Sequence, residues 1–252
     1  MNVRAAVVAG VVLALGGCRI SPLTNKISVG QESFVVLVGH GQGGQTDLFA
    51  GPAGGGGMFQ LTFTRDPERS PMLDPTGVQL AFLREDPQGE VWLVVMNLFN
   101  TAERETTVPT DAGPVERVAW SHDGTRLYLR TGAGLFSTPA PPARLALAPL
   151  IEGSSEAGAA DSALSILLGN PPFAAVVRCP DGGLCIRSGT EDTPLTVDGR
   201  DPLRWTGDSV AYLVDQAVVV RPLGPGRSRR LEWSQMPTGI REPTHFQPIR
   251  KP

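Results

Sequence analysis

A pattern of short apolar strands joined by tight turns recurs along the chain with a period in the forties. Gly77 and Gly124, which end two matching turns, lie 47 residues apart, and Trp120 and Trp205 lie 85 residues apart, close to two periods. A repeat of this length made of short strands is typical of a β-propeller, in which each copy forms one small antiparallel sheet and the sheets pack in a ring. The sequence therefore predicts an all-β fold.

The copies differ in how clearly they follow the pattern. Three of them are recognisable, a fourth is degenerate and an early one is partial; they occupy residues 71–95, 118–137, 202–221, 163–186 and 33–50. About five copies within residues 33–235 predict a β-propeller of five to six blades, some of them degenerate. A β-sandwich with similar turn spacing is the alternative. Ring closure by a strand from the other end of the chain is expected to involve Ser33 to Val38.

One copy carries a specific resemblance. The segment Trp120-Ser-His-Asp-Gly124 before an apolar strand resembles the repeat of TolB-type (WD40-like) propellers, whose common form is Trp-Ser-Pro-Asp-Gly. Gln60-Leu-Thr62 and Pro194-Leu-Thr196 match the Leu-Thr segment that opens such repeats. His122 stands where the family has Pro, and Leu73 stands where it has Trp. The resemblance implies that Asp and Gly form the turn between two strands of a blade and that the Trp packs between blades.

The N-terminus has the pattern of an export signal. Arg4 precedes an unbroken run of apolar residues and glycine from Ala5 to Leu15, followed by Gly16-Gly17-Cys18. The run is too short to span a bilayer, which needs ~20 residues. The segment resembles the lipobox of bacterial lipoproteins, which implies a signal peptide at residues 1–17 and a lipid on Cys18.

Residues 18–32 are expected to be a polar tether between this lipid and the propeller, and the membrane is an expected partner through the lipid. By resemblance to Gram-negative lipoproteins, Arg19 rather than Asp after the cysteine favours the outer membrane, facing the periplasm. In a Gram-positive cell the sorting argument does not apply. Several acyl chains on one cysteine anchor a protein firmly.

Two further cysteines flank a strong turn signal in Cys179-Pro-Asp-Gly-Gly-Leu-Cys185. Apolar residues on both sides predict a hairpin that places the two sulfurs across from each other. In an exported protein a disulfide is the natural state of such a pair, and two reduced, half-buried thiols are the alternative.

The sequence offers no convincing catalytic, cofactor or metal site. Gly39 to Gly44 fits Gly-x-Gly-x-x-Gly, but a strand-like segment follows it where a dinucleotide site needs a helix, so a loop is expected. The three histidines, His40, His122 and His245, fall in different parts of the chain and lack metal-ligand spacing. The Asp residues at 74, 123 and 208 are explained by turns.

Charge excludes one class of partner. Removing residues 1–17 takes one arginine away and leaves 21 basic residues against 25 acidic ones, so no basic face for nucleic acid is implied. A low-complexity insert bracketed by Pro139 to Pro142 and Glu152 to Asp161 is expected to be a surface loop between blades, in which Ala143 to Ile151 could add a strand. Residues 236–252 are expected to be an irregular tail.

Three hypotheses of function follow. The first is a lipid-anchored, non-enzymatic platform that binds an envelope protein or polymer. The second is an enzyme, a propeller lyase or glycan hydrolase with acidic or histidine residues in the central channel. The third is a structural envelope protein without a specific ligand.

Overall fold

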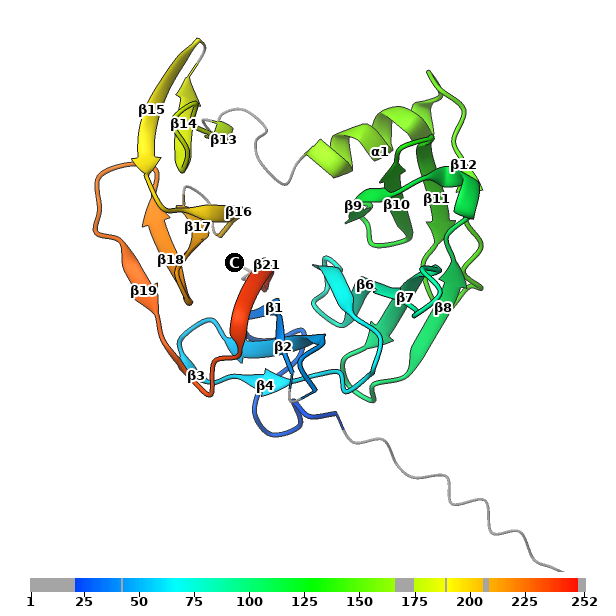
Figure 1. The fold of residues 1–252 in the computed structure, drawn as a ribbon, viewed down its shortest axis with the longest axis horizontal. Coiled ribbons are helices and arrows are strands. Elements are labelled where there is room, and N and C mark those ends of the chain that lie inside the picture. Colours follow the sequence, from blue (N-terminus) through cyan, green and yellow to red (C-terminus); the bar gives the residue numbers. More distant parts are fainter. Residues whose placement is uncertain (1–20, 42, 166–174, 189, 206–208, 249–252) are drawn as a thin grey trace, which may run out of the picture.

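The structure, a computed structural model, describes residues 21–41, 43–165, 175–188, 190–205 and 209–248. The signal segment, Cys18, Asp208 and the end of the tail lie outside these ranges. Within these ranges, five antiparallel sheets are arranged around a common centre, and one edge strand of each sheet lies nearest the middle (Figure 1). The chain is therefore a five-bladed β-propeller, as the repeat predicts, and a β-sandwich is excluded.

Blade 1 joins the two ends of the chain. Its strands, from the innermost outward, are β21 (Thr238–Phe246), β1 (Phe34–His40), β2 (Thr46–Pro52) and β4 (Phe59–Gln60). A short parallel pair, β20 (Trp233–Ser234) with β3 (Gly56–Gly57), ties its outer edge to blade 5. The expected irregular tail at 236–252 is wrong for most of its length, because β21 pairs with β1 and closes the ring. Ser33 to Val38 supplies β1, the strand on which the C-terminal strand closes.

Blades 2 and 3 follow the repeat closely. Blade 2 consists of β5 (Glu68–Leu73), β6 (Gln79–Glu85), β7 (Val91–Asn97) and β8 (Glu103–Thr107), and a 3-10 turn at Thr110–Ala112 leads out of it. Blade 3 consists of β9 (Val115–Trp120), β10 (Arg126–Thr131), β11 (Gly134–Pro139) and β12 (Ala148–Pro149). The short β12 lies within the segment Ala143 to Ile151, where an added strand was expected.

Blades 4 and 5 follow blade 3 in the chain. Among the described residues, blade 4 has three strands, β13 (Ala175–Arg178), β14 (Leu184–Ser188) and β15 (Glu191–Thr196). Blade 5 has four, β16 (Arg200–Arg204), β17 (Ser209–Val214), β18 (Ala217–Pro222) and β19 (Arg229–Leu231). The two blades pack through the apolar side chains of Val176, Leu184, Leu195, Val210 and Tyr212.

Side-chain alternation gives each blade two apolar faces, because successive residues of a strand point to opposite sides of the sheet. In blade 3, Trp120 and Leu127 face blade 2 and join its buried residues. Their neighbours Ala119 and Tyr128 face the other way, against the helix α1 (Ser155–Ser165). The helix covers the face of blade 3 that points away from blade 2 (Figure 1).

This helix corrects two expectations. Glu152 to Asp161 was expected to be a loop, and Ala163 to Leu168 was expected to be a strand of the degenerate copy. Ala160 and Leu164, which are almost wholly buried, show why a helix forms: they lie four residues apart and so occupy one face of it. Alanine is also the residue with the highest helix propensity, and the segment holds several. Residues 166–168 lie outside the described residues.

The described part of the expected tether, residues 21–32, is not a spacer. Its Leu23, Ile27 and Val29 are buried in the apolar core between blades 1 and 2. Burying three such side chains stabilises the packing by roughly 1.5–3 kcal/mol each. The chain therefore becomes part of the propeller at residue 21, and only the residues before it can act as a spacer.

The hairpin of β13 and β14 brings the two cysteines together. Cys179 and Cys185 form a disulfide with a Cα–Cα distance of 5.2 Å, across the turn Pro180–Gly183. Exchanging both for alanine is expected to lower the free energy of unfolding by about 2 kcal/mol, because the bond closes a short loop of the unfolded chain. Urea unfolding of the two forms measures this difference. An equal midpoint for both would show that the bond does not stabilise blade 4.

Candidate functional site

The innermost strands of three blades share one irregular feature beside the central channel. Ser70, Asp201 and Glu242 have positive φ angles of 55°, 47° and 49°, and each precedes a proline. The strand register shifts at each of these positions. Such backbone conformations cost of order 1–3 kcal/mol for a residue other than glycine, so neighbouring contacts must hold them.

The carboxylates of two of these residues, Asp201 and Glu242, supply these contacts. The backbone N–H of Glu242 donates to Asp201 Oδ2 at 3.2 Å, and the backbone N–H of Ser70 donates to Glu242 Oε2. Arg200 donates to Asp201 Oδ2 as well, at 3.1 Å. Each bulge is thus bonded to the one on the next blade, from blade 5 through blade 1 to blade 2.

These strands line a cavity of about 270 Å³ at the centre of the propeller, hereafter the central cavity. Its charged lining consists of Glu116, Arg117, Asp201 and Glu242. Arg117 also donates to the carbonyl of Leu164 at 3.2 Å and so holds the C-terminal end of α1. Within the described ranges, no three His, Cys, Asp or Glu side chains are grouped closely enough to hold a metal ion.

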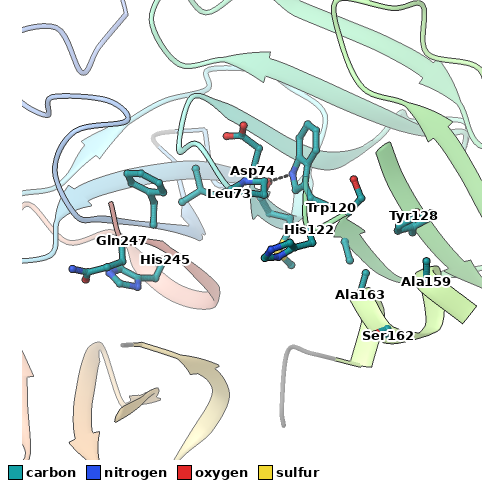
Figure 2. A pocket seen from close by; sticks show the side chains of 15 residues that line it. Leu73, Asp74, Trp120, His122, Tyr128, Ala159, Ser162, Ala163, His245 and Gln247 are labelled. Carbon is teal, nitrogen blue, oxygen red and sulfur yellow. Dashed lines mark hydrogen bonds between the residues drawn. The ribbon is translucent and has the colours of Figure 1, made fainter. Parts of the chain in front are cut away.

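A larger pocket, of about 490 Å³, lies at one mouth of the channel and shares Met72 with the central cavity. We call it the channel-mouth pocket. Its lining comes from the first turns of blades 2 and 3, from the end of β21 and from α1; it comprises Met72–Pro75, Ala119–His122, Tyr128, Ala159, Ser162, Ala163 and His245–Gln247. Figure 2 shows His245 and Gln247 on one side of it and His122, Tyr128 and the helix residues on the other.

Two polar groups of this pocket are occupied by bonds within the fold. Asp74 Oδ1 accepts from the backbone N–H groups of Val78 and Gln79, both at 2.8 Å, and Thr76 donates to its other oxygen. Trp120 Nε1 donates to the carbonyl of Met72 at 2.9 Å, which ties blade 3 to blade 2 (Figure 2). Both residues therefore do what their place in the repeat predicts: Asp74 forms a turn, and Trp120 packs between blades.

His245 is held in its neutral form. Its ring stacks on Trp205 with the ring centres 3.8 Å apart, and its Nε2 is buried without a hydrogen-bond partner. Burial lowers the pKa of His245 to about 4, although a hydrogen bond with the Trp205 backbone opposes this shift. At neutral pH the pocket wall at His245 is thus an uncharged aromatic surface. His122, by contrast, is exposed in the turn that follows Trp120.

The glycine-rich segment at Gly39 to Gly44, His40 and Asp123 do not line either cavity. Gly39 to Gly44 spans the end of β1 and its turn to β2, a hairpin rather than a strand-to-helix junction. His40 lies at this hairpin, at the opposite end of the strands from the turn of Asp74. Asp123 accepts bonds from Ser121 and Thr125 in its turn, and these bonds lower its pKa to about 2.

The proline bulges and the central cavity that they border were not predicted from the sequence. The dipeptides Ser70-Pro71, Asp201-Pro202 and Glu242-Pro243 were a usable signal, because proline in a sheet is confined to edges and bulges. Two of the three lie within or just before the recognised repeats. The third lies in the segment expected to be irregular.

A buried carboxyl lies between blades 1 and 2, at the other end of the strands. Glu68 has no exposed surface; it accepts bonds from Arg84 at 2.9 Å and from Thr62. Burial raises the pKa of Glu68 to about 7, although Thr62 and Arg84 lower it in part. Burial also raises the pKa of the neighbouring Asp47. This cluster lies outside both cavities.

The raised pKa of Glu68 predicts how stability changes with pH. The folded state keeps the proton up to pH values near 7, whereas the unfolded chain loses it near pH 4.5. The stabilisation is therefore complete below pH 4.5 and is lost as the pH rises to 7, by roughly 3 kcal/mol. Urea unfolding between pH 4.5 and 8 should show this fall, and Glu68→Gln should flatten it.

Glu103→Gln is the matched control, since Glu103 pairs with the same Arg84 from a more exposed position. It should leave the pH dependence in place. Parallel profiles for the wild type and Glu68→Gln would show that Glu68 is not the group responsible.

Comparisons with known proteins find structural neighbours of low similarity and no matching family. No family model matches the chain, and no curated protein matches its sequence. Among solved structures, TolB from Acinetobacter baumannii aligns over 82% of this chain and 54% of its own, with 12% identity and a TM-score of 0.42. The periplasmic gluconolactonase of Pseudomonas aeruginosa aligns over 79% of this chain and 67% of its own, with 16% identity and a TM-score of 0.33.

This chain thus spans about half the length of the TolB chain that it matches. By their printed names, these neighbours include a gluconolactonase as well as TolB. The described helix is also not long and apolar enough to cross a membrane.

Proposed function

We propose that the protein is a lipid-anchored β-propeller of the cell envelope that binds a segment of an envelope protein in the channel-mouth pocket. Anchoring rests on the lipobox-like segment that ends at Cys18. Export is further supported by the Cys179–Cys185 disulfide, since such bonds persist in oxidising compartments. By the sorting argument from Arg19, the anchor would be at the outer membrane, on its periplasmic side.

The composition of the pocket wall carries the proposal of binding. Trp120, Tyr128, Phe246 and the alanines of α1 supply apolar and aromatic surface, while Asp74 is saturated by its own turn. A volume of about 490 Å³ is within the usual range for small-ligand pockets, and it would accommodate a few side chains of a partner. The carboxylate of Asp74 is bonded within its own turn, and the buried His245 is neutral. The pocket is therefore suited to recognise a partner by shape and apolar contact.

A pocket-filling variant tests this proposal. Ala163 lines the pocket from α1, so Ala163→Arg would place a long, charged side chain in it. Purified protein, immobilised and exposed to detergent-solubilised envelopes of its own organism, should retain a discrete partner. The variant should retain roughly tenfold less, which corresponds to about 1.4 kcal/mol of binding free energy.

Ala148→Arg is the control, because it makes the same exchange at an exposed position on the outermost strand of blade 3. It should retain the partner as the wild type does. The proposal fails if Ala163→Arg, shown to be folded by circular dichroism, retains as much partner as this control, or if repeated experiments with the wild type find no partner.

The central cavity favours a second candidate, an enzyme. Glu116, Asp201 and Glu242 all line it, as expected of a propeller lyase or glycan hydrolase with a channel site. Two of these carboxylates already bond to the backbone of the next blade, which leaves Glu116 as the group with which to test catalysis. The protein would be assayed for activity on a panel of lactones and acidic oligosaccharides. Activity that is present in the wild type and lost in Glu116→Gln would favour the enzyme over the binding protein.

A further inference from the structure

We infer that the outer rim between blades 1 and 2 lies against the membrane, with Phe63 and Phe99 in contact with the lipid headgroup region. This inference rests on the proposed lipid at Cys18 and adds how the propeller is oriented on the bilayer. The bordering surface is a groove of about 480 Å³, lined by Pro22, Leu61–Thr64, Met96, Thr101 and Glu103. We call it the rim groove.

The first argument is the length of the spacer. Pro22 lines the rim groove, and the neighbouring Ser21 and Leu23 are buried, so the N-terminal segment is fixed to the propeller at this point. Four residue steps separate Cys18 from Pro22. Fully extended, they span at most ~14 Å. A lipid on Cys18 would therefore hold the rim groove within ~14 Å of the bilayer surface, and other parts of the propeller would lie farther away.

The second argument is the exposure of two aromatic side chains on this rim. Phe63 is 71% exposed and Phe99 is 57% exposed, which places them among the four large apolar residues in the described ranges that are notably exposed. The other two, Ile151 and Val197, lie near α1 and after blade 4. Phe63 lines the rim groove itself, and Phe99 lies in the turn between β7 and β8 that also contains the groove residue Thr101.

The exposure of Phe63 is fixed by its neighbours. Thr62 accepts from the backbone N–H of Leu48 at 2.9 Å and donates to Glu68, and the Thr64 hydroxyl donates to the carbonyl of Asp66 at 2.9 Å. Both threonine side chains are therefore bonded to the protein, whereas the Phe63 side chain between them is exposed. The fold thus presents an aromatic ring to the surroundings at a position that a polar residue could occupy.

Phe99 is presented in a similar way. Its backbone N–H donates to Asn97 Oδ1 at 2.9 Å, and the backbone N–H of Ala102 donates to Asn100 Oδ1 at 3.0 Å. These two bonds hold the turn in one conformation. Aromatic side chains are favoured at the interface between lipid and water. Phe63 and Phe99 lie on the rim to which the lipidated N-terminus is fixed. Their contacts with the bilayer would therefore add to the membrane affinity that the acyl chains provide.

Single cysteines labelled with an environment-sensitive fluorophore test this inference on the full-length, lipidated protein in phosphatidylethanolamine–phosphatidylglycerol vesicles. Phe63→Cys and Phe99→Cys each provide one labelling site if Cys18 is lipidated and Cys179 and Cys185 are bonded. Both labels should show blue-shifted emission that is quenched by nitroxide-labelled lipids. Ile151→Cys and Val197→Cys are matched controls, because these side chains are at least as exposed, and their emission should resemble that of the label in water.

The outcomes separate the inference from the anchoring on which it rests. Anchoring is measured separately. If the lipid is on Cys18, the wild type should be found in the vesicle fraction and Cys18→Ser should be lost from it. If the wild type is anchored but a label at 63 or 99 behaves like the controls, the orientation is wrong and the anchor stands. A blue shift without quenching by the labelled lipids would show that protein covers the rim, which also overturns the inference. If the wild type is not anchored through Cys18, both fail.

Discussion

A chain that ends after Pro237 is expected to lose its cooperative fold. The truncation removes β21, the innermost strand of blade 1, and leaves β1 paired with β2 alone. It also removes Ile240 and Phe246, which are nearly fully buried on opposite sides of the blade, in the cores shared with blades 5 and 2. Losing two such side chains costs about 2–5 kcal/mol each, a large part of the 5–15 kcal/mol that stabilises a typical domain.

Thermal unfolding followed by circular dichroism, together with size-exclusion chromatography, measures this effect. Truncation after Pro248 is the control, since it keeps the whole of β21. The short chain should show no cooperative transition, and the control should unfold like the full-length protein. A cooperative transition of the short chain near that of the control would mean that β21 does not close the ring.

The exchange Trp120→Ala is expected to lower the free energy of unfolding by about 3–5 kcal/mol. The indole is 7% exposed, packs between blades 2 and 3, and donates to the carbonyl of Met72 at 2.9 Å. The alanine variant loses the apolar contacts and leaves that carbonyl without this donor. Urea unfolding measures the change.

Trp120→Phe separates the two contributions. Phenylalanine keeps much of the apolar contact and removes only the N–H donor, so most of the stability should return, with a remaining deficit of about 1 kcal/mol. Equal losses for both variants would assign the effect to the hydrogen bond and not to packing. A loss below ~1 kcal/mol for Trp120→Ala would contradict its place in the core.

The repeat made the fold class predictable because its signals are local. Turns such as 74–77 and 121–124 need Asp and Gly for geometric reasons, and alternating apolar residues mark the strands between them. The structure confirms the all-β propeller on this basis. The closing strand could not be recognised in the same way, because β21 is separated from its own blade by nearly the whole chain and its pattern is broken by Glu242-Pro243.

The helix α1 was missed for a different reason. A segment rich in Ala, Gly and Ser has little amphipathic pattern, and its helical form depends on burying Ala160 and Leu164 against blade 3. The described part of the expected tether, residues 21–32, was misjudged for a similar reason. Leu23, Ile27 and Val29 are separated by other residues in the sequence, and only the core between blades 1 and 2 buries them together. Contacts between distant parts of a chain decide both cases.

The candidate site was the least predictable part. The channel-mouth pocket gathers residues from blades 1, 2 and 3 and from the helix, so no local motif reveals it. Asp74 was expected to form a turn and Trp120 to pack between blades. The hydrogen bonds of both side chains are explained by these structural roles. Asp74 and Trp120 lie near His122 and His245 only because β21, which was expected to be an irregular tail, pairs with β1.

The central claim is that the channel-mouth pocket is where the protein meets its partner. Photo-cross-linking in living cells tests it most directly, with a benzophenone amino acid placed at His122 or at His40. Both side chains are exposed. His122 lies in a turn that lines the pocket, and His40 is the last residue of β1, at the opposite end of the strands. The account predicts one discrete protein adduct from position 122 and none of that size from position 40. The same adduct from both positions, or an adduct from position 40 alone, would contradict it.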